Sequence, residues 1–372
     1  MNSKDRAFAN FYKDKKVLIT GHTGFKGSWL TVWLLKLGAK VIGISKDIPT
    51  KPSMFEKLKL EEKMEHHFED IRDLETMQKI IGEVKPDLLF HLAAQPIVSL
   101  SYSDPIETIS SNVMGTANIL EALKTSNHNC TVVMITSDKA YDNVEQVWGY
   151  KEDDKMGGKD IYSGSKGMAE LVIKSYYHSF LKDEKCNIRL SIGRAGNVIG
   201  GGDWAKDRIV VDCMEAWSDG KSVEIRSPEA TRPWQHVLEP LSGYLNLAEA
   251  LHVDDSLHGE AFNFGPRAEQ NHTVQQLLND LSEYWHFESV DDAYRVTDNI
   301  PFHEAGLLKL NCDKALFYLK WQSNLEYRDT IRFTSEWYYD FYKRDIDIYS
   351  KTIEQISQYE SMAKEKGLKW ME

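Results

Sequence analysis

The feature of this chain that most constrains its fold is a regular alternation of short apolar runs with helix-like stretches. The first three apolar runs are 17–20 (VLIT), 41–45 (VIGIS) and 87–94 (DLLFHLAA). Runs of this kind are typical of strands that are buried on both faces of a parallel sheet. Because helix-like segments separate them, the sequence predicts an α/β fold with a doubly wound parallel sheet, the Rossmann arrangement.

The alternation continues to about residue 195 and then gives way to loops that contain glycine, proline and tryptophan. Further strands are predicted at 131–137 and 188–196, and a helical tail is predicted from Asn324. Four more helices are predicted, at 28–38, 74–83, 112–124 and 162–181. We expect a Rossmann domain over 12–195 to which 232–265 return, a smaller interleaved substrate-binding lobe from 196–231 and 266–340, and a helical C-terminal tail over 341–372.

The composition narrows the class of protein. The chain has 372 residues and a net charge of −12, so it can bury a large core, and nucleic acid is not expected to be its main partner. Its four cysteines lie far apart without a CxxC spacing, which favours reduced thiols in a cytoplasmic protein over disulfides or a zinc site. The polar N-terminus and the lack of an apolar run of about 18 residues predict neither a secretion signal nor a membrane span.

A glycine loop, GHTGFKG, follows the first predicted strand and opens a predicted helix. Gly21, Gly24 and Gly27 allow a tight turn, a close approach of the backbone to a pyrophosphate, and close packing of helix on strand. The N–H groups at the start of the helix are donors for an anion. The loop therefore predicts dinucleotide binding. His22 and Lys26 lie near the phosphates in one interpretation and are solvated side chains in the other.

The acid that would bind the adenosine ribose is less clear. The second strand ends at Ser45, where Asp47 could hold the ribose but Lys46 leaves a phosphorylated ribose possible. Asp70 and Ile71, at another strand end, are either adenine contacts or part of a surface loop. The candidate cofactor-binding residues are Gly21, Thr23, Gly24, Phe25, Lys26, Gly27, Asp70, Ile71, Ala93, Ala94, Gln95, Asn112, Thr136, Tyr162 and Lys166.

Tyr162 and Lys166 are four residues apart, so on a helix they share one face. A cation beside a phenol stabilises the phenolate, and a bound nicotinamide adds to that effect. We therefore expect the pKa of Tyr162 to be lowered toward the working pH, which would make Tyr162 a usable base for hydride chemistry. The alternative is a solvated helix face.

Ser137, Asp138 and Lys139 follow another predicted strand and bring a hydroxyl, an acid and an amine to the edge of the sheet where ligands bind. This set suggests proton transfer for the elimination of water. As a base Lys139 would need a lowered pKa, and as an acid Asp138 would need a raised one. The alternative is a salt-bridged pair in a loop.

Five motifs together resemble an extended short-chain dehydrogenase/reductase. They are GHTGFKG, HLAAQ (91–95), NVMGT (112–116), TSDK (136–139) and YSGSK (162–166). Longer stretches resemble the CDP-glucose 4,6-dehydratases, a branch of the NAD-dependent nucleotide-sugar epimerase/dehydratase family. These stretches are TSDKAYDN (136–143), SKGMAE (165–170), GRAGNVIGGGDW (193–204), RPWQHV (232–237) and HEAGLLKL (303–310), within a resemblance that runs from about residue 12 to about 340.

The resemblance implies a mechanism in which the cofactor is NAD and the substrate a nucleotide-diphospho-hexose. Tyr162 matches the base for oxidation at C4, and Ser137 the hydroxyl that binds the C4 oxygen. Asp138 matches the acid that protonates the departing C6 hydroxyl. Lys139 stands where many hexose dehydratases carry a glutamate base and where CDP-glucose dehydratases carry lysine. Lys166 completes the catalytic set. NAD is favoured over NADP because the hydride is returned within the reaction.

The lobe is expected to bind the nucleotide diphosphate. Asn197, Arg208 and Arg232 offer amide and guanidinium donors, and the resemblance implies diphosphate contacts for all three. The scattered histidines show no metal spacing, so no metal is expected. Ala140 departs from the cysteine that family members often carry there. A homodimer formed through paired helices is implied by the resemblance alone.

Two other functions compete with this interpretation. A nucleotide-sugar 4-epimerase would share the fold, Tyr162 and Lys166, but it has no need of the Asp138–Lys139 pair. A dehydratase that acts on another nucleotide-hexose is a variant of the main interpretation. A non-catalytic NAD-binding sensor or scaffold is the alternative of a different class, and turnover of any nucleotide-hexose would exclude it.

Overall fold

The computed structural model describes residues 7–225, 227–287, 289–297 and 307–372. Its centre is a seven-stranded sheet with the order β11-β6-β5-β4-β1-β2-β3, in which every neighbouring pair is parallel. This order, with its switch point between β1 and β4, is that of the Rossmann fold, so the predicted fold class is confirmed. The strands are β1 (Lys16–Thr20), β2 (Lys40–Ser45), β3 (Glu65–Phe68), β4 (Leu88–His91), β5 (Cys130–Ile135), β6 (Ile188–Ala195) and β11 (Ala261–Phe264).

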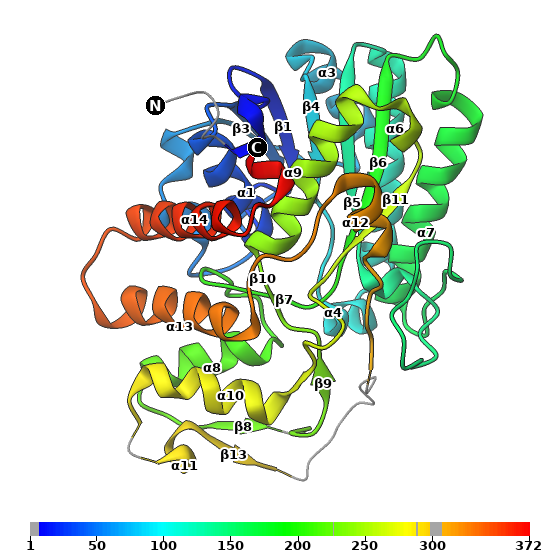
Figure 1. Cartoon of the computed structure of the whole chain (residues 1–372). Coiled ribbons are helices and arrows are strands. Elements are labelled where there is room, and N and C mark those ends of the chain that lie inside the picture. Colours follow the sequence, from blue (N-terminus) through cyan, green and yellow to red (C-terminus); the bar gives the residue numbers. More distant parts are fainter. Residues whose placement is uncertain (1–6, 226, 288, 298–306) are drawn as a thin grey trace.

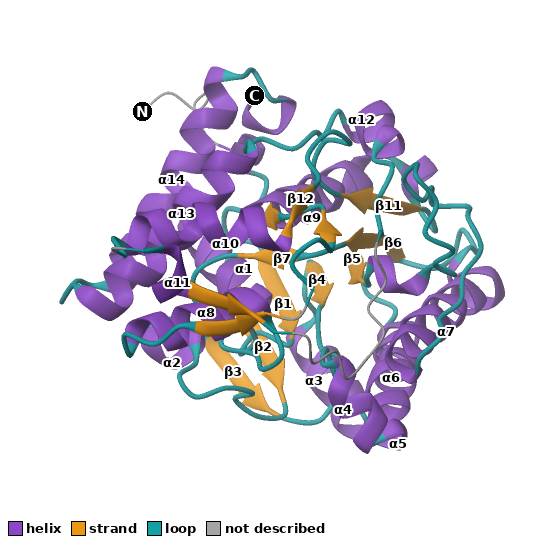
Figure 2. Cartoon of the chain, turned by 90° about the horizontal axis from the view of Figure 1, so that it is seen from below, coloured by secondary structure: helices purple, strands orange, loops and turns teal. Residues whose placement is uncertain are grey.

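Alternate strand residues point to opposite faces of the sheet, so the sheet has two apolar faces. Each face is covered by its own set of helices. In β1, Val17 and Ile19 belong to one apolar cluster and Leu18 belongs to the other. Figure 2 shows the two groups of helices on opposite sides of the sheet. The first cluster includes α1 (Phe25–Lys36), α9 (Leu238–Val253) and α14 (Ile348–Glu365), and the second includes α3 (Leu74–Val84), α6 (Gly115–Ser126) and α7 (Ile161–Tyr176).

A smaller group of elements lies beyond the carboxyl ends of the strands. The chain enters it directly from β6, because only two residues separate the end of β6 from the start of β7. Figure 1 shows this group below the sheet. Its strands form three separate two-stranded sheets. The elements are β7 (Val198–Ile199) with β10 (Gln235–His236), β9 (Thr231–Arg232) with β12 (His272–Thr273), β8 (Val223–Ile225) with β13 (Tyr294–Val296), and the helices α8 (Ile209–Ser218), α10 (Val274–Ser282) and α11 (Val290–Ala293).

Two parts of the chain differ from the sequence prediction. The region after residue 195 was expected to consist of loops, yet it contains α9, which is buried over most of its length and so lacks an amphipathic pattern. The apolar run 87–94 is strand only as far as His91, and residues 92–97 form a loop across the end of β4. Three short helices complete the first half: α2 (Met54–Lys57), α4 (Val98–Ser103) and α5 (Pro105–Ile109).

The C-terminal region is helical, as predicted from Asn324, and it packs on the rest of the chain. It contains α13 (Tyr327–Lys343) and α14, and α12 (Asp313–Leu319) precedes it. The Trp33 indole on α1 donates to Glu360 Oε1 on α14 at 2.8 Å, and the Phe8 ring stacks on Trp370. Within the ranges that the structure describes, none of the helices combines the length and the apolar character needed to cross a membrane.

Candidate active site

The glycine loop makes the sharp turn that the sequence predicted. Gly21 has a φ of +78°, and a Cβ on Gly27 would lie 2.1 Å from the Gly21 carbonyl oxygen, so neither position accepts a side chain without a shift. A Cβ on Gly24 would have only one neighbour, at 3.4 Å. Gly24 is also the N-cap of α1 and offers no side chain to the first-turn N–H groups. These groups are therefore free to bind an anion such as a pyrophosphate.

The residues around the ends of β2 and β3 form an ion-pair network. Lys46 Nζ lies 2.8 Å from Glu107 Oε1, and Glu107 also pairs with Arg72. Arg72 in turn holds Asp70 through contacts of 2.6–3.0 Å, which keeps the pKa of Asp70 below its usual value. The Ile71 side chain packs in the core, where it would meet a Cβ on Gly115. Because Glu107 pairs with both cations, the ends of β2 and β3 offer little net charge to a phosphorylated ribose.

The residues after β4 are tied to α7 by one buried side chain. Asn112 accepts a hydrogen bond from the Gln95 backbone N–H at 2.7 Å and donates to the Ser165 hydroxyl at 2.8 Å. Ser165 lies between Tyr162 and Lys166 on α7, so Asn112 fixes the loop that holds Ala93 and Ala94 against this helix. Its predicted contact with the cofactor stays a prediction.

Tyr162 and Lys166 lie on one face of α7, as their spacing predicted, but the expected pKa of Tyr162 is wrong for the free protein. Burial raises this pKa to about 12 and outweighs the Arg208 charge and the hydrogen bond with Ser137, both of which lower it. Lys166 lies 5.8 Å from the centre of the Tyr162 ring, and its own pKa is lowered to about 8 by burial and by Lys26. Only added positive charge or a hydrogen bond from a ligand could bring Tyr162 into the working range.

Ser137, Asp138 and Lys139 form a turn directly after β5. The Ser137 hydroxyl donates to Asp138 Oδ1 at 3.0 Å and accepts from the Lys139 backbone N–H at 3.2 Å. Asp138 is 3% exposed, and its Oδ2 finds no hydrogen-bond donor among the described residues. Burial raises the pKa of Asp138 although Lys139 and Lys26 pull it down. That is the direction an acid in this position requires, while the catalytic role itself stays a prediction.

Arg208 comes from the lobe and reaches the same place. Its guanidinium pairs with Asp203 and lies close enough to Tyr162 for its charge to lower the tyrosine pKa. Lys26, on the glycine-loop side, is half-buried, and burial together with the Arg208 charge lowers its pKa to about 8. Asp138, Tyr162 and these two cations therefore gather at the carboxyl ends of the strands, although they come from four separate segments.

The other substrate candidates lie on the lobe side. Asn197 lies in the loop between β6 and β7, half-buried, with its backbone oxygen accepting from Gln235 N–H. Arg232 is on β9, and its Nη1 donates to the Thr231 carbonyl oxygen at 2.8 Å. The first half of the predicted motif at 303–310, including His303 and Glu304, falls outside the described residues.

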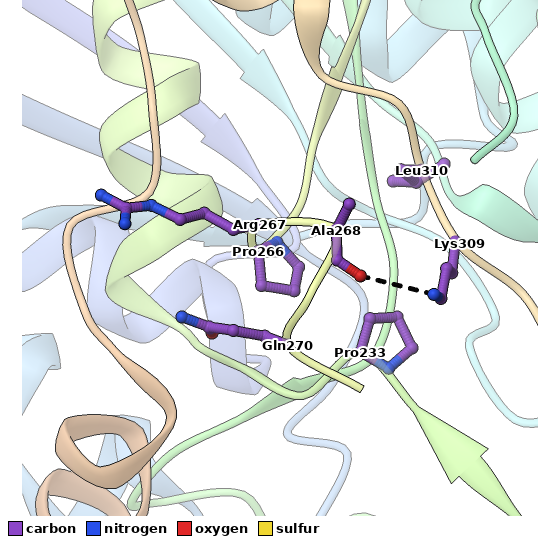
Figure 3. A pocket seen from close by; sticks show the side chains of 7 residues that line it. All are labelled: Pro233, Pro266, Arg267, Ala268, Gln270, Lys309 and Leu310. Carbon is purple, nitrogen blue, oxygen red and sulfur yellow. Dashed lines mark hydrogen bonds between the residues drawn. The ribbon is translucent and has the colours of Figure 1, made fainter. Parts of the chain in front are cut away.

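A small recess borders this side of the site next to Pro233, the residue after Arg232. Figure 3 shows it between Pro266, Arg267 and Lys309, with Lys309 Nζ donating to the Ala268 carbonyl oxygen at 3.4 Å. Its volume of about 10 Å³ is room for one water molecule and not for a nucleotide base. A base would have to bind elsewhere or open this recess by moving its walls.

The residues present fit a dinucleotide whose ribose carries no phosphate. The open space at Gly24 and the uncapped start of α1 suit a pyrophosphate. The Lys46–Glu107 pair leaves little net charge for an extra phosphate. Asp138, whose Oδ2 has no hydrogen-bond partner among the described residues, lies close enough to Tyr162 to influence the tyrosine pKa, and Lys166 lies 5.8 Å from the centre of the Tyr162 ring.

Two buried charged residues next to the site were not predicted from the sequence. Glu170 and Arg194 form an ion pair in which both side chains are fully buried, and Thr136 Oγ1 donates to Glu170 Oε1 at 2.6 Å. The sequence carried two signals for them. Glu170 continues the Tyr162–Lys166 face of α7 by one more turn, and Arg194 is a charged residue inside an apolar strand.

The sheet order, the glycine loop after β1 and the tyrosine–lysine face of α7 define an extended short-chain dehydrogenase/reductase. Residues 18–334 match the family model described as GDP-mannose 4,6 dehydratase, and the chain belongs to this family. It is 47% identical to the CDP-glucose 4,6-dehydratase of Salmonella typhimurium over 95% of this chain and 98% of that protein.

Solved structures with the same fold include a dTDP-glucose 4,6-dehydratase from Streptomyces venezuelae with NAD bound and a UDP-glucose 4-epimerase from Thermotoga maritima. The first matches with a TM-score of 0.74 and 19% identity, over 88% of this chain and 97% of its own. The second matches with a TM-score of 0.74 and 22% identity, over 88% and 99%. At these identities the likeness establishes the fold and does not separate the two activities.

Proposed function

We propose that this protein catalyses the NAD-dependent dehydration of CDP-glucose to CDP-4-keto-6-deoxyglucose. The observation that carries the proposal is a buried acid, Asp138, held beside Ser137 and Tyr162 with one carboxyl oxygen that no described residue binds. A 4-epimerase needs the tyrosine but has no step for such an acid. The identity to the Salmonella typhimurium enzyme supports the choice of nucleotide and hexose.

In the first half-reaction Tyr162 removes the proton of the C4 hydroxyl, and Ser137 holds the C4 oxygen by a hydrogen bond. A bound NAD would supply the hydride chemistry, taking the hydride from C4 and giving it back at C6. Lys166 adds positive charge beside the phenol, and Arg208 does the same from the lobe side. The result of this half-reaction is a ketone at C4, which makes the C5 proton acidic.

In the second half-reaction Lys139 takes the C5 proton while Asp138 gives its proton to the departing C6 hydroxyl, so one water leaves. The burial that raises the pKa of Asp138 keeps it protonated for this step. When C6 is reduced, the proton from Lys139 returns to C5. The proton that Tyr162 gained balances the one that Asp138 lost, and the sum of the steps is the loss of one water.

On the substrate side, we infer that Asn197, Arg208 and Arg232 bind the diphosphate. The Arg208 guanidinium lies near Tyr162, which supports a place for the phosphates close to the reacting sugar. Residues 196–231 and 266–340 would form the substrate lobe together with β9 and β10, 12–195 with the rest of 232–265 the cofactor domain, and 341–372 a tail that packs on it. We also propose a cytoplasmic protein, in keeping with its four separate cysteine thiols.

A homodimer is proposed on the strength of one exposed surface. Leu171 and Phe180, on α7 and its extension, are 55% and 48% exposed, and Met114, just before α6, is 53% exposed. Large exposed apolar side chains on neighbouring helices, here α6 and α7, suit a protein contact. Sedimentation velocity tests this, since a chain that remains monomeric at all concentrations would contradict the proposal.

The experiment that tests the activity is a panel of CDP-, UDP-, dTDP- and GDP-glucose with added NAD, read by mass spectrometry. The expected result is the loss of one water from CDP-glucose at a rate well above that for the other three. An isomeric product of unchanged mass would instead identify an epimerase. The Tyr162→Phe variant, run in parallel, controls for a contaminating enzyme.

A further inference from the structure

The segment 136–141 carries the proposed acid and is held at both of its ends by one buried ion pair. We propose that Glu170 and Arg194 are positioning residues that set Ser137, Asp138 and Lys139 against Tyr162 and Lys166. The inference deepens the proposed function and rests on it. Neither Glu170 nor Arg194 is proposed to touch the sugar or the cofactor.

Glu170 holds the first end of the segment. Its Oε1 accepts hydrogen bonds from Thr136 Oγ1 at 2.6 Å and from Arg194 Nε at 2.7 Å. Glu170 lies one helical turn after Lys166 on the same face of α7, so its carboxylate fastens the catalytic helix directly to the end of β5. The distance between Tyr162 on the helix and Ser137 in the turn after β5 is thereby fixed.

Arg194 holds the second end. Its Nη1 donates to the Tyr141 hydroxyl at 2.6 Å and to the Glu152 carbonyl oxygen at 3.0 Å. Tyr141 is the residue that follows the 138–140 turn, and its hydroxyl donates in turn to Asn263 Oδ1 on β11 at 2.8 Å. The turn that carries Asp138 and Lys139 is therefore anchored to the sheet before and after the two reactive residues.

The energetics of the pair favour a geometric role over a stabilising one. Both side chains are fully buried, and removing two charges from water costs most of what their attraction returns. The pair instead fixes the orientation of the groups around it. The planar guanidinium donates from Nε and Nη2 to Glu170 and from Nη1 to Tyr141, so one rigid group holds both ends of the turn. A displacement of about 1 Å at a reacting group can cost roughly 100-fold in rate.

Tyr141→Phe is the sharpest test, because it removes one hydroxyl and leaves the ion pair whole. We expect kcat for water loss to fall about tenfold or more with KM for CDP-glucose unchanged. Reduced nicotinamide should accumulate during turnover, because oxidation at C4 continues while the acid is misplaced. Tyr359→Phe is the matched control: Tyr359 is also buried and makes two side-chain hydrogen bonds, to Glu239 and Ser242, but it lies on α14. It should lower the melting temperature and leave kcat and the nicotinamide signal at the wild-type level.

The double variant Glu170→Met with Arg194→Met removes both charges and keeps the site apolar, so no unpaired charge is left buried. We expect it to lose about 100-fold or more in kcat. The titration of the Asp138 carboxyl, followed by carbon-13 NMR with Asp138→Asn for assignment, should move toward its ordinary value in Tyr141→Phe and in any folded double variant, because a loosened turn admits water.

The outcomes separate the two proposals. A wild-type protein that releases water from none of the nucleotide-hexoses overturns the proposed function, and the Asp138 titration then still tests the positioning role. An active wild type together with a Tyr141→Phe variant that matches Tyr359→Phe in kcat, nicotinamide signal and Asp138 titration overturns the positioning role alone.

Discussion

The two sides of the active site are built differently. On the sheet side, strands of four to eight residues join in one seven-stranded sheet, and the reactive groups stand on buried hydrogen bonds such as Thr136 to Glu170. On the lobe side, strands of two or three residues pair only two at a time. Arg208 and Arg232 are half-buried there, and Arg208 pairs with Asp203 of its own lobe.

The difference matches the work that each side is proposed to do. Proton transfer needs atoms placed within a few tenths of an ångström, which a rigid and fully hydrogen-bonded frame provides. A diphosphate is held by charge, which tolerates some movement of the groups that bind it. Variants on the sheet side should therefore lower kcat, and variants on the lobe side should mainly raise KM.

The largest effect is expected for Tyr162→Phe, which removes the proposed base and nothing else. Turnover of CDP-glucose should fall by about 100- to 10,000-fold, the range for loss of a general base. Because the tyrosine acts before the acid, no reduced nicotinamide should form, and rapid-scan absorbance during a single turnover measures this. A variant that still reduces NAD at the wild-type rate would assign the base to another residue.

Asp138→Asn and Lys139→Ala are expected to act on the second half-reaction alone. Each should slow water loss by about 100-fold or more, while oxidation at C4 continues and reduced nicotinamide accumulates. Lys155→Ala is a suitable control, since Lys155 pairs with Asp142 close by in the sequence but is 83% exposed. Mass spectrometry of the products and absorbance of the cofactor together follow the two steps. Wild-type water loss in both variants would contradict the elimination mechanism.

On the lobe side, Arg208→Gln and Arg232→Gln should each raise KM by about 10- to 100-fold, because each removes a charge-assisted hydrogen bond to the diphosphate. Only Arg208 is expected to change the pH profile as well. Its charge lowers the pKa of Tyr162, so removing it raises that pKa, and the rise of kcat/KM with pH should move to higher pH. Arg208→Lys restores the charge and should restore the profile but not the full affinity. Identical shifts in the two glutamine variants would contradict this distinction.

The same comparison explains what the sequence could predict. Apolar runs and glycine spacing are local signals, and they predicted the sheet, the dinucleotide loop and the tyrosine–lysine face of α7. The polar edge strand β3 has only four residues, EHHF, and α9 is buried nearly all around, so neither carries a periodic pattern.

The part of the site that escaped prediction depends on tertiary structure. Glu170 meets Arg194 across 24 residues, and charged side chains are normally expected in solvent, so their pairing follows only from the packing of α7 on β5 and β6. The pKa of Tyr162 was predicted with the wrong sign for the free protein because a cation four residues away is visible in the sequence, whereas burial is not.

The smallest effect concerns Glu239, at the junction of the two sides. It follows the lobe strand β10, opens α9, and accepts hydrogen bonds from the backbone N–H groups of Asn324 and Leu325, just before α13. Burial raises its pKa to about 7, so the folded state keeps a proton that the unfolded chain releases near pH 4.5. Stability from this group is full below about pH 4.5 and is lost as the pH rises toward 7, at about 1 kcal/mol per pH unit.

Glu239→Gln removes that dependence. In urea unfolding at pH 5 and pH 7, the wild type should lose stability relative to the variant as the pH rises. Glu249, whose pKa is also raised to about 7, is present in both proteins and cancels in the difference. Glu354→Gln, at a side chain that is 54% exposed, should leave the difference at zero. Parallel pH dependence in the wild type and Glu239→Gln would mean that Glu239 is ionised in the folded state, and that the junction is held by a charge and not by a neutral carboxyl group.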